Sequence, residues 1–332
     1  MKMKPTIRDV AKAAGVSIAT VSKALNGVDV VKAETKLKVL AAAKELNYVP
    51  NLLGKQLKSG QTNMLGFFTN SVSGPYFYAL IESIARTADN MGFGLNVFVT
   101  KRHDTIQNYL FGNVVDGVIV FESRITGPDV DMISQHRVPA IFLDRPMVAD
   151  KIGSITFNSY QEAFDATAYL ISLGRRKIAY LAGYPDNYDS NERQRGYEDA
   201  LKKYGLPVNK DLIILGLFEE PTSYSEMRRF ISLHPEDIPD GILAGNDISA
   251  IGAMRALKES GISVPQEVSV IGFDDVEIAQ YFQPSLTTTR NPIGRQGVLA
   301  VKQLVGMISN NDQGQSEVLD GQLVVRNSTT IK

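Results

Sequence analysis

Polar and aromatic side chains follow several short apolar runs of the sequence, at positions where strands are expected to end. They are amides, carboxylates and phenyl rings: Asn70, Phe121, Asp144, Phe218, Asn246 with Asp247, and Asp274 with Asp275. Ligands of parallel α/β sheets bind beyond the carboxyl ends of the strands, so these side chains are expected to line one cleft. Carboxylates and amides hydrogen-bond to vicinal hydroxyl groups, and an aromatic ring covers the apolar face of a sugar. The residue types therefore predict a pocket for a small polar molecule.

No catalytic motif accompanies these residues. The sequence has no Gly-Lys-Ser/Thr phosphate loop and no nucleophile elbow, and the GFG at 92–94 lacks the third glycine of a dinucleotide fingerprint. The three histidines, His103, His136 and His234, are scattered and lie near expected surface turns. The sequence thus predicts a binding protein that is not an enzyme and that uses neither a metal nor a cofactor.

Strands and helices that alternate along the chain must position the pocket residues. Strands are predicted at 64–69, 93–100, 117–121, 140–143, 177–182, 212–217, 241–244 and 268–273, and helices near 76–91, 159–174, 190–204, 222–233, 248–260 and 292–309. Such alternation with nearly continuous apolar strands predicts a doubly wound parallel α/β architecture. The length of this region suits two sheets better than one.

The first 48 residues differ, because they predict three short helices and no strand. Thr6 with Asp9 resembles a capping box, and Gly15 permits a tight turn before a second helix that Ser17 can cap and Asn26-Gly27 ends. A third helix is predicted at about 34–47. The segment TIRDVAKAAGVSIATVSKALNG fits a helix-turn-helix whose second helix, the recognition helix, lies in the DNA major groove.

Side chains of this head divide into an inner and an outer set. The apolar inner positions are Val10, Ala14, Val16 and Val21, and the outer positions of the recognition helix are Ile18, Ala19, Ser22 and Lys23. The hydroxyl groups of Thr6, Ser17, Thr20 and Ser22 can donate to phosphates, which fixes register without reading sequence.

Charge is distributed unevenly over a chain of ordinary composition. The 332 residues are 44% hydrophobic and 21% charged, contain no cysteine and carry a net charge of −1. Residues 1–60 hold 11 Lys/Arg against 4 Asp/Glu, giving +7, which leaves −8 for the remainder. A basic head on an acidic body suits phosphate binding by one end. We expect a soluble cytoplasmic protein, since no segment reads as a signal peptide or a membrane span.

Over essentially its whole length the chain resembles the lactose-repressor/galactose-repressor family of bacterial transcription regulators. The matching residues are IRDVAKAAGVSIATVSKALNG, KVLAAAKELNYVPN and the later GND and GFDD motifs. The resemblance implies that Ile18, Ala19 and Lys23 read the operator, with Lys23 donating to a guanine edge and the other two making apolar contacts. The alternative is that Ile18 packs inside the head. Lys32 stands where the family usually has a capping serine, a loss of about 1 kcal/mol, although a lysine there can reach a phosphate.

The resemblance also implies a hinge at 50–61 that becomes helical on DNA, with Leu57 as a minor-groove wedge. Gly54 replaces the more usual alanine and lowers the helix propensity by about 1 kcal/mol. A plain linker is the alternative. The DNA-contact residues expected in all are Thr6, Ser17, Ile18, Ala19, Thr20, Ser22, Lys23, Asn26, Lys32, Asn51, Gly54 and Leu57.

For the body the resemblance implies two lobes like those of periplasmic sugar-binding proteins, joined by crossovers near 161, 290 and 322. The expected divisions are a helix-turn-helix head at 1–49, the hinge at 50–61 and an effector-binding and dimerisation domain at 62–332. Lobe one is expected at about 62–160 and 291–321, and lobe two at about 161–290 and 322–332. The expected effector-binding residues are Asn70, Phe77, Asp144, Arg193, Phe218, Asn246, Asp274 and Asn291.

Each of these residues has a plainer interpretation. Asp247 and Asp275 can cap the helices that follow them, which we rate above ligand contact. Phe218 can belong to the core of a lobe, and Arg193 can form a structural ion pair. Phe121 is larger and less polar than the residue that some members of the family have at this position.

The expected partners are a pseudo-palindromic operator DNA, a sugar or sugar phosphate effector and a second copy of the chain, with no membrane. A homodimer is favoured over a tetramer, because the chain ends five residues after Asn327 without a heptad extension. The rival interpretations are a secreted sugar-uptake receptor, a sugar-acting enzyme, and a regulator of the same family that answers to a non-sugar effector or a protein corepressor.

Overall fold

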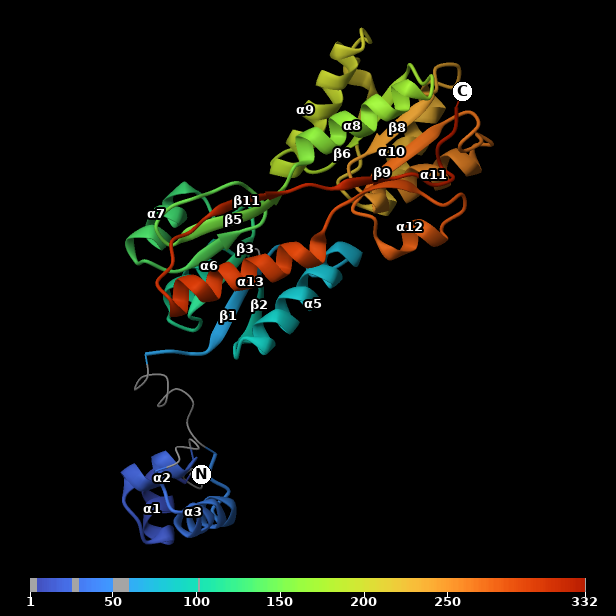
Figure 1. Ribbon diagram of the computed structural model, residues 1–332. Coiled ribbons are helices and arrows are strands. Elements are labelled where there is room, and N and C mark those ends of the chain that lie inside the picture. The colour runs from blue at the N-terminus through green and yellow to red at the C-terminus, as the bar shows by residue number, and fades with distance from the viewer. Residues whose placement is uncertain (1–4, 26–29, 50–59, 101, 332) are drawn as a thin grey trace. The chain divides into compact units, whose positions relative to one another are not determined.

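The chain divides into two compact units, Met1–Thr62 and Asn63–Lys332. The computed structural model describes residues 5–25, 30–49, 60–100 and 102–331, and Figure 1 traces its helices and strands. Asn26, Asn51, Gly54 and Leu57 therefore lie outside the described residues, as does most of the expected hinge.

The first unit is the expected three-helix head, formed by α1 (Ile7–Ala14), α2 (Ile18–Leu25) and α3 (Ala33–Glu45). At the start of α1 the backbone N–H and the hydroxyl of Thr6 both donate to the Asp9 carboxylate, at 2.8 and 2.7 Å. Gly15 adopts the left-handed conformation, with φ of 66°, that a tight turn between two helices requires. The Ser17 hydroxyl then accepts from the backbone N–H of Thr20 at 3.1 Å, as predicted for a cap of α2.

The core of the head consists of small apolar side chains, which let three short helices approach closely. Its buried members are Val10, Ala11, Val21, Ala24, Val39, Ala42 and Ala43, and Ala14 and Val16 pack against them. The predicted inner set is confirmed. Lys32 precedes α3 without making a side-chain cap, also as expected.

The second unit contains two six-stranded sheets, which we call lobe one and lobe two with the helices that cover them. The sheet of lobe one has the order β11-β5-β4-β3-β1-β2. Its strands are β1 (Met64–Thr69), β2 (Gly94–Val99), β3 (Gly117–Phe121), β4 (Ala140–Phe142), β5 (Ile152–Phe157) and β11 (Ser316–Leu319), all paired in parallel.

The sheet of lobe two has the order β12-β10-β9-β8-β6-β7. Its strands are β6 (Ile178–Ala182), β7 (Ile213–Leu215), β8 (Gly241–Ala244), β9 (Ser269–Phe273), β10 (Thr287–Arg290) and β12 (Gln322–Val324). Only β12 runs antiparallel to its neighbour among these pairings. Two mostly parallel sheets confirm the predicted fold class.

Helices cover both faces of each sheet, which explains why the strands are apolar throughout. On lobe one, α5 (Pro75–Asn90) and α13 (Ile293–Ser309) cover one face, while α6 (His103–Phe111) and α7 (Gly127–Gln135) pack on the other. On lobe two, α8 (Ser159–Ser172) and α9 (Tyr188–Lys203) oppose α10 (Glu220–Leu233) and α11 (Asp247–Glu259), and α12 (Glu277–Tyr281) follows β9. Neighbouring residues such as Phe67 and Phe68 of β1 therefore enter different cores.

Three connections join the lobes, after β5, after β10 and between β11 and β12. Figure 1 shows these segments running side by side between the two groups of strands. Lobe two begins with α8 at Ser159, two residues before the position expected from the sequence. Two of the connections lead from lobe one to lobe two and the one after β10 leads back, and such an arrangement lets two lobes change their mutual angle while each sheet stays intact, as in hinge closure around a ligand.

Several elements were not predicted, and one strand was predicted three residues too long, whereas the other predicted strands differ from the observed ones by at most two residues. The unpredicted ones are α6, α7, α12, β5, β10, β11 and β12. Strand β10 has the sequence TTTR, which carries no apolar signal, yet its three threonines are buried. The strand predicted at 212–217 comprises only Ile213–Leu215, because Leu212 ends a 3-10 turn and Leu217 has a positive φ of 54°.

Candidate functional site

The recognition helix α2 presents an exposed surface that its sequence predicted. Val21 and Ala24 are buried in the head and fix the rotation of the helix. Ile18 is 45% exposed, and Ala19 and Lys23 are exposed beside it. The interpretation that Ile18 packs inside the head is therefore wrong. An exposed isoleucine next to an exposed lysine can contact base edges in a major groove.

The hydroxyl groups of the head are less free than the sequence suggested. Thr6 donates to Asp9, and the hydroxyls of Ser17 and Thr20 lie 2.9 Å apart in a hydrogen bond. Ser22 is half-buried on α2, and Lys32 is exposed at the start of α3. Ser17 and Thr20 therefore stabilise the start of α2, and a phosphate there has to share or replace their mutual hydrogen bond.

In the body, Arg193 of α9 lies at the centre of a group of mostly buried polar side chains, which we call the cleft cluster. Its members are Tyr76, Asp144, Glu162, Asp189, Arg193, Asp274 and Asn291. It stacks over the Phe273 ring at 4.5 Å and donates to the Gly245 carbonyl at 2.5 Å, with Nη2 3.9 Å from Asp274 Oδ1. Asn291 donates to the same Asp274 oxygen at 3.2 Å. Three of the predicted effector residues, from α9, the end of β9 and the residue after β10, are thus in contact.

The carboxylates of the cleft cluster are buried and carry perturbed pKa values. Burial raises the pKa of Asp274, while Arg193 and Asn291 partly oppose the rise. Burial also raises the pKa of Asp144, which follows β4 in lobe one, to about 6, despite the nearby Arg145. Burial lowers the pKa of Arg193, but Asp274 and Asp189 outweigh it, so the net pKa is raised and the guanidinium stays charged.

Three members of the cleft cluster were not predicted. Asp189 accepts from Ser159 at 2.7 Å, and Glu162 accepts from the backbone N–H of Gly321 at 2.7 Å. Tyr76 of α5 donates to Gln296 at 3.1 Å. Burial raises the pKa of Tyr76, and the charges of Asp189 and Asp274 raise it further, so this lobe-one side chain faces lobe two.

A sequence signal existed for Asp189 alone. It precedes Arg193 by four residues on α9, and that spacing places both side chains on one face of a helix. Glu162 and Tyr76 occupy ordinary helical positions, and only tertiary contacts bring them to the cluster, at the Gly321 crossover for Glu162 and beside the charges of lobe two for Tyr76.

Unsatisfied polar atoms gather in the cleft cluster. Seven buried side-chain atoms of the described residues have no hydrogen-bond partner, and four of them are Asp144 Oδ1, Glu162 Oε2, Arg193 Nε and Asn291 Oδ1. Leaving a buried polar atom unpaired costs about 1–3 kcal/mol. Donors and acceptors thus remain to be satisfied in one place, as they would be by a ligand rich in hydroxyl groups.

Other predicted effector residues lie at the margin of the cleft cluster or serve the fold. Asn70 is exposed after β1, and Phe77 packs edge-on against Phe121 at 5.4 Å. Asn246 caps α11 by accepting from the N–H of Ser249 at 2.8 Å. It also donates to the carbonyl of Phe218 at 3.1 Å, so its amide is engaged at both ends.

The roles expected for Asp247 and Asp275 are wrong. The residue that caps α11 is Asn246, whereas Asp247 is fully buried and accepts from Thr288 and from the N–H of Val276 at 2.8 Å. Asp275 binds Arg290 at 2.6 Å and Arg326 at 2.5 Å. Both aspartates therefore tie the loop after β9 to the strands beside it, which holds Asp274 in place at a φ of 102°.

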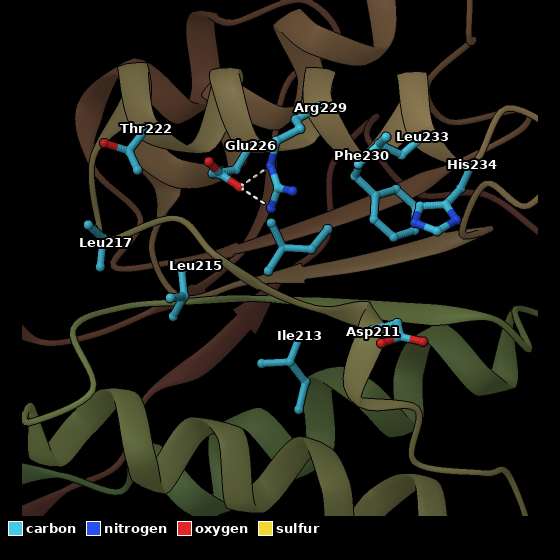
Figure 2. A pocket seen from close by; sticks show the side chains of 11 residues that line it. Asp211, Ile213, Leu215, Leu217, Thr222, Glu226, Arg229, Phe230, Leu233 and His234 are labelled. Carbon is cyan, nitrogen blue, oxygen red and sulfur yellow. Dashed lines mark hydrogen bonds and ion pairs between the residues drawn. The ribbon is translucent and has the colours of Figure 1, made fainter.

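The surface pockets in the described part of the body include one at the edge of lobe two and one between the lobes. One, of about 630 Å³, lies at the outer edge of lobe two between β7 and α10, and Figure 2 shows Ile213 and Leu215 on one side of it and Phe230 on the other. No predicted effector residue lines it. The other, of about 500 Å³, is lined by segments of both lobes and includes Asp274 and Asn291.

Residues 6–51 match the bacterial regulatory proteins of the lacI family, and residues 167–329 match the periplasmic binding protein-like domain. The chain is 35% identical to the transcriptional regulator AscG of Escherichia coli K12, over 97% of this chain and 98% of that protein. It is 32% identical to the transcriptional repressor PurR of Histophilus somni, over 97% and 98%. The chain belongs to the lacI family.

Solved structures agree over the full length of this lacI-family chain. A lac repressor dimer bound to operator and the anti-inducer ONPF is similar with a TM-score of 0.82 and 28% identity, covering 99% of this chain and all of that one. A complex of the regulator CelR with cellobiose has a TM-score of 0.73 and 28% identity, covering 98% and 99%.

This protein is therefore a LacI-type DNA-binding transcription regulator, and its relatives are regulators rather than enzymes. A sugar-uptake receptor is not favoured, because the helix-turn-helix head is part of the match. Within the described residues, no helix is both long enough and apolar enough to span a membrane.

Proposed function

We propose that this regulator binds a pseudo-palindromic operator as a homodimer and that a small carbohydrate in the cleft between its lobes controls operator affinity. It acts in the cytoplasm, where the DNA is, and binds its effector without transforming it. The cleft cluster carries this proposal. A ligand there touches both lobes through side chains such as Asp144 and Arg193, and it can therefore favour one lobe arrangement over another.

The chemistry of the cleft cluster supports a polyhydroxylated ligand. Arg193 supplies a donor, Asn291, Asp274 and Asp144 supply acceptors, and each of the four side chains is at least nine-tenths buried. A pair of vicinal hydroxyl groups both donates and accepts, and so it satisfies such a mixed set. Of the structural relatives, CelR was solved with cellobiose and the lac repressor with ONPG. Cellobiose belongs to the class of polyhydroxylated ligands that this cluster suits.

On the DNA side we propose that Lys23 reads a guanine edge and that Ile18 and Ala19 make apolar contacts with bases. All three are exposed on α2. Thr6, Ser17, Thr20, Ser22 and Lys32 would position the head on phosphates. Asn26, Asn51, Gly54 and Leu57 complete the proposed contacts from the sequence, with Leu57 as the minor-groove wedge of the hinge.

The test uses the full-length protein and a labelled duplex from upstream of its own gene. Fluorescence anisotropy would measure the operator Kd with and without each member of a carbohydrate panel, at fixed salt because phosphate contacts make binding salt-dependent. We expect specific binding and a sugar-dependent change of about 5–150-fold.

Two negative results have different meanings. If the protein fails to bind the duplex specifically even at low ionic strength, the proposal that it regulates its own gene is excluded. If the protein binds the duplex specifically but no sugar changes the operator Kd, the proposed DNA binding is supported and the effector is instead a non-sugar molecule or a protein corepressor.

A further inference from the structure

The pocket of about 500 Å³, which we call the mouth pocket, lies beside the cleft cluster. Its walls come from α5 of lobe one, the loop 274–277 of lobe two and the segment 290–295 that leads into α13. In Figure 1 the starts of α5 and α13 lie at the end of lobe one that faces lobe two. Asp274 and Asn291 belong both to the cleft cluster and to the lining of the mouth pocket, so the two spaces share a wall.

The lining of the mouth pocket has the chemistry of a sugar subsite. Asn291 is 4% exposed, and its Oδ1 has no partner although its amide nitrogen donates to Asp274. Tyr78, in contrast, is 62% exposed and lines the same pocket from α5. An unsatisfied buried amide oxygen beside an open aromatic ring can take a hydroxyl group and the apolar face of one ring together.

Charge in the mouth pocket selects against anions. Its lining contains four carboxylates and only two guanidinium groups. Both arginines are already engaged, Arg290 with Asp275 at 2.6 Å and Arg295 with Glu317 at 3.6 Å. Asp274 and Asp275 are likewise paired, with Arg193, Arg290 and Arg326, so the lining carboxylates without an ion pair are Glu82 and Glu277. A phosphate group in this space would meet these two carboxylates and no unpaired cation of the lining.

We infer that the effector is a neutral glycoside of at least two units, with one unit in the cleft and the next in the mouth pocket against Tyr78. This inference rests on the proposed carbohydrate effector and specifies it further. A pocket of this volume falls within the range of about 300–1,000 Å³ usual for small-molecule sites, which leaves room for a second ring. Because both lobes line the pocket, the second unit adds contacts that depend on the lobe arrangement and strengthens the coupling to DNA.

The experiment is calorimetric titration of the full-length protein with glucose, galactose, cellobiose, maltose, lactose, melibiose and glucose 6-phosphate. At least one disaccharide is expected to bind about tenfold or more tightly than its constituent monosaccharides. Tyr78→Ala is expected to remove about tenfold of that advantage and to leave the Kd of the monosaccharide unchanged.

Two matched variants separate the mouth pocket from a general surface effect. Tyr78→Phe keeps the ring and is expected to keep the advantage of the disaccharide. Tyr204→Ala removes a tyrosine that is 49% exposed at the end of α9, away from this pocket, and is expected to change neither Kd.

The failures are distinguishable. Monosaccharides that bind as tightly as every disaccharide, or a Tyr78→Ala variant that weakens both equally, would overturn the second subsite and leave the carbohydrate effector intact. Tighter binding of glucose 6-phosphate than of any neutral sugar would overturn the charge argument and with it the inference. Binding of no member of the panel would overturn the proposed carbohydrate effector itself.

Discussion

Replacing Glu162 by glutamine is expected to stabilise the folded protein at pH 8 and to have a much smaller effect at pH 5. Burial raises the pKa of Glu162 from 4.5 to about 7 in the folded state, while Arg193 opposes the rise. A carboxyl group with a raised folded-state pKa favours folding fully below pH 4.5, and that stability is lost as the pH rises to about 7.

The size of the effect follows from the two pKa values. The raised pKa of Glu162 lowers the free energy of unfolding by about 3 kcal/mol at pH 8, where the folded-state carboxyl is ionised, and by about 1 kcal/mol at pH 5, where it must take up a proton on folding. Glutamine cannot ionise, and its carbonyl oxygen keeps an acceptor for the Gly321 N–H that Glu162 Oε1 now binds at 2.7 Å. The gain of the variant is therefore bounded by these values, with a difference of roughly 2 kcal/mol between the two pH values.

The assay is urea unfolding of the full-length protein at pH 5 and pH 8, from which the free energy of unfolding of each variant is obtained. Glu236→Gln, which removes an exposed carboxylate before β8, is the matched control and is expected to change little at either pH. If Glu162→Gln changes the free energy of unfolding equally at both pH values, the idea that the ionised, buried Glu162 destabilises the folded protein is refuted.

Three further substitutions test the head and the cleft. Lys23→Ala is expected to weaken operator binding by about 1–3 kcal/mol and to reduce the ratio of the Kd for mismatched DNA to the Kd for the operator, both measured by fluorescence anisotropy. Equal weakening on all duplexes would instead indicate that Lys23 contacts a phosphate. Lys32→Ser should stabilise α3 by about 1 kcal/mol, seen as a higher thermal midpoint of the head, since Lys32 makes no side-chain cap; an unchanged midpoint would contradict the cap argument. Arg193→Met should abolish the sugar response but keep operator binding, and a retained response would remove Arg193 from the effector site.

Much of the fold was predictable because its signals are local. The continuous apolar runs of β1, β3 and β8 gave the strand bounds without error, since both faces of those strands are buried. The Thr6–Asp9 pair and Gly15 located α1 and its turn for similar reasons. In contrast, β10 is buried through threonine hydroxyls that bond to distant partners, such as Thr288 to Asp247, and no local pattern reports such contacts.

The candidate site was predicted only in part, because strand ends say which side chains reach the cleft but not what each one binds. Asp274, Asn291 and Arg193 do come together. Asn246 and Asp247 have the same strand-end position, yet they serve the fold by capping α11 and anchoring Val276. Tyr76 reaches the cleft cluster across the lobes, and that depends on the angle between the sheets, which the sequence does not encode locally.

The most direct test of the account is whether ligand and operator affect each other's binding reciprocally. The Kd of the tightest-binding sugar would be measured on the full-length protein alone and with saturating operator, and the operator Kd with and without that sugar. We expect both affinities to change by the same factor, because coupling between two sites is a single free energy. A sugar Kd that is identical with and without operator would contradict control of DNA binding through the cleft.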